Sequence, residues 1–239
     1  MIDTIKNTID KYPLGYIFTT TDFDMAVKNP KGVNKVLNDL VAEGVLCKLS
    51  KGRFYKPQIH EFGELPLDIY QTVKDLLEKD GKVIGYLTGY SAFNDLKLTA
   101  QVPSVLQIGM RREKKALVRG TYRISFIRQE NAITKENIPL LRLLDCLRFF
   151  KIIPDITPDS TCQRLLHLLK ELDEQQIAKI KKLALKYTPQ TIALLGAMLE
   201  VLYPNEDTAA LFKKLNPMTV YKLSISQNIL PTQKRWRIK

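Results

Sequence analysis

Hydrophobic residues recur at helical spacing at the start of the chain. The first apolar positions are Ile2, Ile5, Ile9 and Tyr12. This spacing predicts a helix over residues 2–12, which the following proline and glycine end. Residues 15–18 (GYIF) are expected to be extended. Thr21 and Asp24 have the spacing of a capping box, which predicts a second short helix that runs to about Lys28.

The clearest apolar stripe follows an Asn-Pro pair. Its members are Val33, Val36, Leu37, Leu40 and Val41. They share one face of a helix, which a core would bury. Asn29 is expected to cap this third helix, because proline is tolerated at the first helical position. Gly44 is expected to end it in the left-handed conformation.

Two short β-prone runs come next, VLCKLS (45–50) and RFYKP (53–57), separated by a turn with a glycine. Such a pattern predicts a β-hairpin. The order is then helix, short strand, helix, helix and hairpin, which is that of a winged helix-turn-helix. We therefore assign residues 1–60 to a DNA-binding domain of this kind.

The rest of the chain reads as a second unit, residues 61–239, after a polar linker at 58–66. Its first part (67–130) is a small mixed α/β region, with helices expected at 67–79 and 91–96 and strands at 83–87, 99–103, 105–109 and 121–127. Its second part (137–216) is helical, with helices expected at 138–150, 163–172, 174–187, 191–202 and 205–216. Thr157, Asp173 and Thr188 are the expected caps. The predicted fold class is therefore α+β.

The composition is that of a globular protein with an excess of cations. The 239 residues carry a formal net charge of +12, and 45% of them are hydrophobic. Such an excess points to an acidic partner: nucleic acid, an anionic membrane surface or an acidic protein. No apolar run reaches the length of a membrane span, and the N-terminus has no signal-peptide pattern, so a cytoplasmic protein is expected.

The residues that catalysis or metal binding requires are sparse. There are three widely spaced cysteines and two histidines, which fit neither a disulfide framework nor a zinc site. Phosphate-binding loops, dinucleotide fingerprints and nucleophile elbows are lacking. We therefore expect no cofactor and no enzymatic activity; a nuclease would need clustered acids or a His–acid pair.

The polar face of the third helix carries the candidate chemistry. Lys31, Asn34, Lys35 and Asn38 share this face by their spacing of three and four. In the major groove of DNA, lysine can donate to guanine and asparagine can pair with adenine. Recognition helices use their N-terminal half for such contacts. The alternative is that these side chains only solvate the helix.

Further cations surround this face in the sequence. Lys48, Lys51 and Arg53, with Ser50 among them, would make the hairpin a basic wing that contacts phosphates or the minor groove. Thr20, Thr21 and Lys28 are possible additional phosphate contacts. Arg111 and Arg112 open a basic segment that continues through Lys114, Lys115, Arg119 and Arg123. This segment and the basic tail at 234–239 could both extend the DNA footprint. The alternatives for the segment are that it binds an acidic partner or is a solvated loop. The alternative for the tail is that it is frayed.

Four segments resemble the AbiEi-type antitoxin family: GYIFTTTDF, KVLNDLVAEGVLCKLSKGRFYKP, LTGYSAFNDLKLTAQVP and YTPQTIALLGAMLE. The resemblance spans about residues 15–200. It implies a bacterial autorepressor that binds inverted repeats in its own promoter, acts as the antitoxin of a type IV toxin–antitoxin system in abortive phage infection, and counters a nucleotidyltransferase-like toxin. Lys97-Leu98 stands where the family usually has Gly-Leu, and the third helix has asparagine where relatives often have arginine.

Two interpretations therefore remain open. The first is an operator-binding repressor and antitoxin, and an operator of inverted repeats would place two copies on DNA. The second is a protein-interaction module, in which the winged helix docks a protein partner and the helical half is a scaffold. The salt dependence of DNA affinity separates the two.

Overall fold

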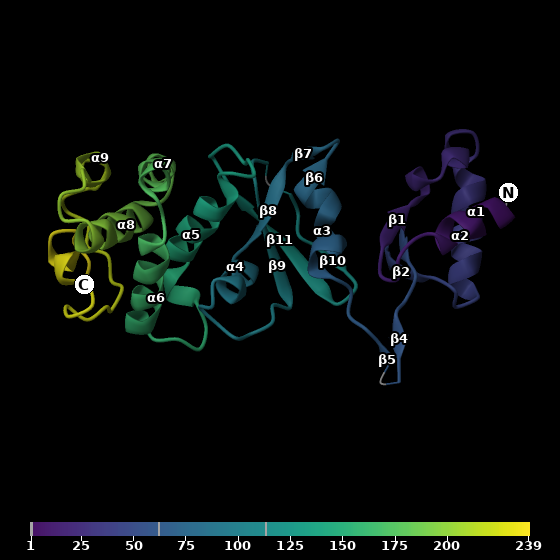
Figure 1. The fold of residues 1–239 in the computed structure, drawn as a ribbon, viewed down its shortest axis with the longest axis horizontal. Helices are drawn as coiled ribbons and strands as arrows, with labels where there is room; N and C mark the ends of the chain where they lie inside the picture. The colour runs from purple at the N-terminus through teal and green to yellow at the C-terminus, as the bar shows by residue number, and fades with distance from the viewer. Residues whose placement is uncertain (1, 62, 113) are drawn as a thin grey trace. The chain divides into compact units, whose positions relative to one another are not determined.

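The computed structural model describes residues 2–61, 63–112 and 114–239, which form a mixed α+β fold (Figure 1). The chain divides into two units. Unit 1 comprises the residues up to Leu76 together with Leu117–Arg123, and unit 2 comprises Leu77–Ala116 and Ile124–Lys239. The boundary expected at residue 60 therefore falls inside unit 1. Within the described ranges, every helix is too short or too polar to cross a lipid bilayer.

Unit 1 begins with the elements that its hydrophobic pattern predicts. In chain order they are α1 (Ile2–Asp10), β1 (Ile17–Thr19), the 3-10 helices η1 (Thr20–Asp22) and η2 (Asp24–Val27), α2 (Pro30–Ala42), β2 (Cys47–Ser50) and β3 (Arg53–Tyr55). The three strands form an antiparallel sheet in the order β1-β3-β2. Phe18 of β1 is paired with Phe54 of β3 in this sheet. The helices predicted at 2–12 and from Pro30, the extended segment and the hairpin are confirmed.

The core of unit 1 lies between these helices and the sheet. Its buried members are Ile5, Ile9, Phe18, Phe23, Val33, Val36, Leu37, Leu40, Leu46 and Phe54. The rings of Phe18 and Phe54 stack with their centroids 6.4 Å apart, and Phe23 meets Phe18 edge to face. Aromatic pairs of this geometry add to the free energy gained from burying their area. The core therefore holds α2 against the sheet by its apolar stripe.

Two predictions for unit 1 were wrong. The capping box begins at Thr19, not at Thr21: the backbone amide of Thr19 donates to Oδ2 of Asp22 at 2.6 Å. Strand β1 ends at Thr19, so the turn starts there and the next residues form 3-10 turns instead of an α-helix. The linker is also more ordered than expected, because β4 (Ile59–His60) pairs with β5 (Gly63–Glu64). Helix α3 (Ile69–Leu77) follows it.

The mixed region contains a four-stranded sheet in the order β10-β11-β9-β8. Its strands are β8 (Gly85–Thr88), β9 (Val105–Met110), β10 (Leu117–Arg119) and β11 (Tyr122–Arg128). A short pair, β6 (Glu78–Lys79) and β7 (Lys82–Val83), precedes it, and α4 (Tyr90–Asp95) follows β8. Strands β8 and β9 are antiparallel, with Leu87 opposite Ile108. Strand β10 was not predicted.

The strand predicted at 99–103 is absent, since these described residues have no regular structure. The side-chain amide of Asn94 donates to the backbone carbonyls of Thr99 and Gln101 at 3.4 and 3.1 Å. These two carbonyls therefore accept hydrogen bonds from a side chain and not from the backbone of a neighbouring strand. Just before this segment, Lys97 has a φ of +58°, in the left-handed region.

Unit 2 ends in helices that pack around one central helix. The central helix is α8 (Pro189–Leu202). The others are α5 (Ile138–Arg148), η3 (Phe150–Ile152), α6 (Pro158–Lys170), α7 (Glu174–Ala184), α9 (Ala209–Phe212) and η4 (Pro231–Lys234). The caps expected at Thr157, Asp173 and Thr188 are confirmed, each accepting a hydrogen bond from a backbone amide in the first turn. Every residue from Thr191 to Leu199 is buried, so α8 is apolar on all sides, as a core helix must be.

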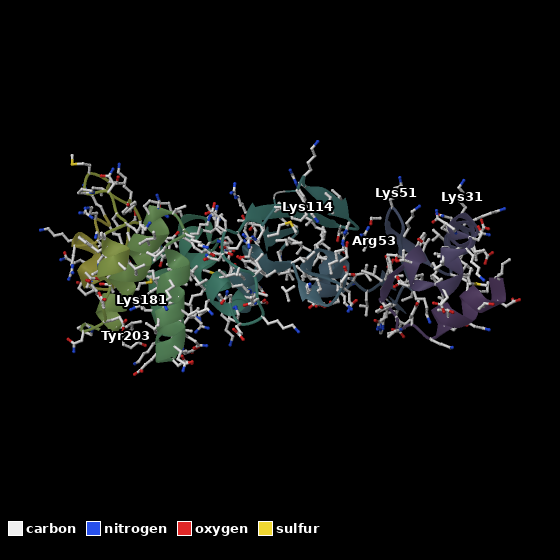
Figure 2. The ribbon with its side chains drawn as sticks, turned by 90° about the horizontal axis from the view of Figure 1, so that it is seen from above. Lys31, Lys51, Arg53, Lys114, Lys181 and Tyr203 are labelled. Carbon is white, nitrogen blue, oxygen red and sulfur yellow. The ribbon has the colours of Figure 1, made fainter. Side chains whose placement is uncertain are left out.

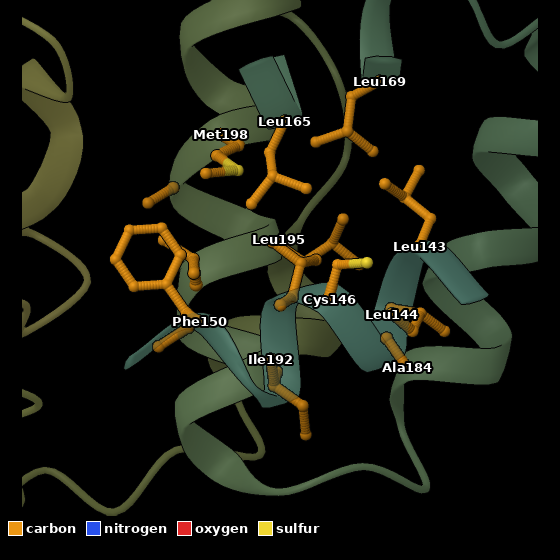
Figure 3. Packing of buried hydrophobic residues seen from close by; sticks show 14 of the residues in the cluster. Leu143, Leu144, Cys146, Phe150, Leu165, Leu169, Ala184, Ile192, Leu195 and Met198 are labelled. Atoms are coloured by element: carbon orange, nitrogen blue, oxygen red, sulfur yellow. The ribbon is translucent and has the colours of Figure 1, made fainter. Parts of the chain in front are cut away.

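The side chains of α5, α6 and α7 interdigitate with those of α8 (Figure 3). The C-terminal tail joins this core. Trp236 is fully buried, and a Cβ on Gly196 of α8 would overlap its ring. Arg235 pairs with Glu200 at 3.3 Å. The alternative of a frayed tail is therefore wrong, because the tail's single tryptophan fills the space that a glycine leaves open.

Candidate nucleic-acid interface

Helix α2 is positioned by signals in its own sequence. The side chain of Asn29 accepts a hydrogen bond from the amide of Gly32 at 2.9 Å, so the helix begins at Pro30 as predicted. At the other end, Gly44 has a φ of +75°. A glycine reaches this conformation without steric cost and ends the helix.

The two faces of α2 differ as predicted. Val33 and Leu37 are fully buried, and Val36 and Leu40 are buried to at least nine-tenths. Lys31, Asn34 and Lys35 are exposed on the opposite face. Among the described residues, no ion pair engages either lysine. The helix therefore presents hydrogen-bond donors and positive charge from its N-terminal half.

Asn38 differs from the other three residues of this face. It is half-buried, and its Nδ2 donates to the backbone carbonyl of Asn34 at 2.6 Å. Its Oδ1 accepts a hydrogen bond from Nζ of Lys48 in β2 at 3.1 Å. The same ammonium lies 5.8 Å from the ring centre of Phe54. Asn38 thus links the helix to the hairpin, and its amide already has partners within the protein.

The β2–β3 hairpin presents two further exposed cations, one in its turn and one in β2. Gly52 has a φ of +72° and no heavy atom within 4 Å of where a Cβ would lie. The turn therefore requires a left-handed residue and leaves open space around it. Lys51, beside this glycine, is exposed, as is Lys48. In Figure 2, Lys31 and Lys51 project from the same side of unit 1.

Arg53 is held inside unit 1. Its Nη2 donates to Oδ2 of Asp75 at 2.5 Å, and the same carboxylate accepts two hydrogen bonds from Arg119. The side chain of Arg119 is only 4% exposed, and its Nη1 also donates to the carbonyl of Thr72. We name Arg53, Asp75 and Arg119 the arginine clamp. Arg53 was predicted to contact DNA, but in this structure its guanidinium is occupied.

Asp75 and Arg119 were not foreseen as partners of the hairpin. Burial raises the pKa of Asp75, but the hydrogen bonds and charges of Arg119 and Arg53 outweigh it, and the net pKa lies below the usual value. The carboxylate is therefore charged at neutral pH. No local pattern in the sequence indicates this contact, because the three residues lie on separate elements.

The remaining predicted contacts are scattered. Thr21 is exposed, but its hydroxyl shares a hydrogen bond of 2.7 Å with that of Thr19. Thr20 is half-buried and Lys28 is exposed. Arg111 and Arg112 are exposed in unit 2, where they border a cavity of about 400 Å³ with Val83 and Ile84 in its lining.

These arrangements supply donors and positive charge. Among the described residues no group of histidines, cysteines and acids could hold a metal ion. Cys146 and Cys162 are buried, and burial raises the pKa of both thiols. Ammonium and amide groups on an exposed helix and hairpin are suited to phosphate oxygens and base edges.

The family model that matches residues 4–177 is described as a family of unknown function (DUF6088). This chain belongs to that family. No curated protein matches the chain. Among solved structures, this chain is similar to the RV2827C protein from Mycobacterium tuberculosis, with a TM-score of 0.51 and 13% sequence identity. The match covers 93% of this chain and 84% of the other, and it shows a shared fold.

Proposed function

We propose that unit 1 is a winged helix-turn-helix that binds double-stranded DNA, and that the protein is a transcriptional regulator. The observation that carries the proposal is the exposed polar face of α2, where Lys31, Asn34 and Lys35 lie opposite the buried apolar stripe. The order of helices and strands, the basic hairpin and the net charge of +12 support it.

In this proposal α2 enters the major groove with its N-terminal half. Lys31 and Lys35 donate to guanine or to phosphate, and Asn34 pairs with adenine. Asn38 acts in part through Lys48, whose ammonium it holds beside the helix. Lys48 and Lys51 contact phosphates next to the groove. Arg53 contributes only if DNA draws it away from Asp75.

Gel shifts on the promoter of the protein's own operon test this directly. Lys35→Ala should weaken binding to the operator by about 1–3 kcal/mol if a base contact is lost, and should weaken binding to unrelated DNA less. Lys51→Ala should weaken binding to all sequences and reduce the salt slope by about one. Lys6→Ala is the matched control, because Lys6 is an exposed lysine of unit 1 on α1.

The outcome that contradicts the proposal is equally clear. If full-length protein shows no affinity for DNA at low salt, the DNA-binding proposal is wrong and the alternative of a protein-interaction module is supported. If Lys35→Ala and Lys31→Ala both bind as the unchanged protein does, DNA is bound elsewhere. A palindromic operator protected over two half-sites would indicate two copies on DNA.

We further propose that the regulator is the antitoxin of a type IV system. The four segments similar to the AbiEi-type family support this. The test is co-expression with the neighbouring reading frame. If that frame encodes a nucleotidyltransferase whose toxicity this protein relieves, the role is supported; if the protein gives no relief, the antitoxin role is wrong while the DNA-binding proposal stands.

A further inference from the structure

A polar cavity of about 250 Å³ opens on unit 2, far along the chain from α2. It is lined by Arg128, Gln129, Glu130, Arg148, Lys186, Tyr187 and Thr188. These residues come from the end of β11 and the segment after it, the end of α5, and the connection between α7 and α8. Three separate parts of the fold therefore supply one lining.

Cations dominate this lining. Arg128, Arg148 and Lys186 face one acid, Glu130, so the formal charge of the lining is +2 (three cations less one anion). Arg128 pairs with Glu130 at only 3.5 Å, and both side chains are more than half exposed. An ion pair this exposed is weak. Glu130 therefore does not hold Arg128 firmly, and the lining keeps an excess of cationic donors.

The floor of the cavity is fixed by a buried network. Gln129 is 4% exposed, and its Nε2 donates to the hydroxyl oxygens of Tyr86 and Tyr187 at 2.9 and 2.8 Å. Both tyrosines donate in turn to Asp145, which is fully buried. A network with all these bonds made holds Gln129 and Tyr187 in one arrangement. The cavity thus has a rigid floor with cations around it.

Helix α8 adds a favourable field at the same place. Its capping residue Thr188 lines the cavity, and the helix runs for 14 residues to Leu202. The N-terminal end of a helix carries partial positive charge. This effect by itself would not make a site, but it has the same sign as the three side chains.

We propose that this cavity binds a small phosphorylated anion. Arginine guanidinium groups match the oxygens of a phosphate with two parallel hydrogen bonds, and Lys186 adds a point charge. The volume of about 250 Å³ lies below the range of about 300–1,000 Å³ found for drug-sized ligands, so the ligand is the size of a phosphate or a monophosphate. The cavity is independent of the proposed DNA-binding face.

The test uses full-length protein and calorimetric titration at constant ionic strength. The probes are inorganic phosphate and a nucleoside 5′-monophosphate, measured in separate arms. Saturable binding of one molecule per chain is expected. Arg148→Gln and Lys186→Gln should each raise the Kd about tenfold or more, as the loss of a charge-assisted hydrogen bond predicts. Tighter binding of the monophosphate than of phosphate would show that the ligand carries an organic group.

Matched variants separate a built site from general attraction to a basic protein. Lys179→Gln removes an exposed cation of α7 outside the cavity and should leave the Kd unchanged. Arg148→Lys should recover part of the affinity that Arg148→Gln loses. If Lys179→Gln weakens binding as much as Lys186→Gln, or if neither probe saturates, the proposal is wrong. Lys186 is exposed, so its variant tests the site even if Arg148→Gln fails to fold.

Discussion

Arg53 of the hairpin donates from Nη2 to Oδ2 of Asp75, 2.5 Å away and 22 residues further along the chain. This carboxylate also holds Arg119, whose side chain is 4% exposed. One acid therefore compensates two guanidinium groups in unit 1. The contact makes the position of the β2–β3 hairpin depend on α3, and it removes one cation from the set available to DNA.

Asp75→Asn should destabilise unit 1. The change leaves the buried guanidinium of Arg119 without a full countercharge. We expect the free energy of unfolding to fall by about 1–3 kcal/mol. This is less than the roughly 3–5 kcal/mol for breaking a fully buried ion pair, because the side chain of Asp75 is 43% exposed. Hydrogen exchange of unit 1 amides measures it, and Glu43→Gln, at an exposed acid, is the control. An exchange pattern equal in both variants would contradict the clamp.

The arginine clamp also predicts a pH dependence. The pKa of Asp75 is lowered in the folded state, so its contribution is present above the unfolded pKa of about 4 and is lost as the pH falls through the folded value. The stability gap between the unchanged protein and Asp75→Asn should therefore narrow below pH of about 4. A stability gap that is constant from neutral to acid pH would show that Arg119 and Arg53 do not lower the pKa of Asp75.

Asp145 should show the opposite trend in unit 2. Burial raises its pKa, and hydrogen bonds from Thr88, Tyr86 and Tyr187 offset this only in part. A raised folded pKa gives stability that is present below about pH 4 and is lost as the pH rises through the folded value. The unchanged protein should therefore lose stability relative to Asp145→Asn as the pH rises from about 4.

The readout for Asp145 is the fluorescence of Trp236 during urea unfolding, since Trp236 is the only tryptophan and is buried in unit 2. At acid pH the variant should be less stable by about 1–3 kcal/mol, because its amide group meets hydroxyl donors. The matched control is Asp173→Asn, an exposed residue at which asparagine can still cap α7. A pH trend equal in both variants would contradict a raised pKa at Asp145.

Lys48 and Asn38 should be energetically coupled. Their hydrogen bond of 3.1 Å joins β2 to α2. In a double-mutant cycle of Lys48→Ala and Asn38→Ala, measured by hydrogen exchange of unit 1, we expect a coupling of about 1 kcal/mol. Lys31→Ala combined with Asn38→Ala should be additive within about 0.3 kcal/mol. Additivity in both cycles would mean that the bond contributes nothing in solution.

Lys97→Gly should stabilise unit 2. Lys97 follows α4 with a φ of +58°, while its amide bonds to the carbonyl of Asn94 and that of Leu98 to Phe93. This is the hydrogen-bond pattern of a Schellman motif, whose left-handed position favours glycine. A gain of about 1 kcal/mol is expected from the steric cost removed. Lys97→Ala keeps a Cβ and should give no gain in the same Trp236 unfolding measurement.

The sequence alone determined the features that arise within a few residues. The stripe from Val33 to Leu40 sets which face of α2 is buried, because helical spacing alone brings these residues together. Asn29, Asp173 and Thr188 act as caps, since each needs only an amide in the next turn. The exposed lysines of the candidate interface follow from the same periodicity.

Only the tertiary structure decided which predicted contacts are free. Arg53 and Lys48 look alike in the sequence, but one is bound by Asp75 and the other lies beside Asn38. The tail is ordered because Trp236 packs where Gly196 lacks a side chain. Burial and ion pairing depend on neighbours that the fold brings from tens of residues away, and periodicity along the chain carries no record of them.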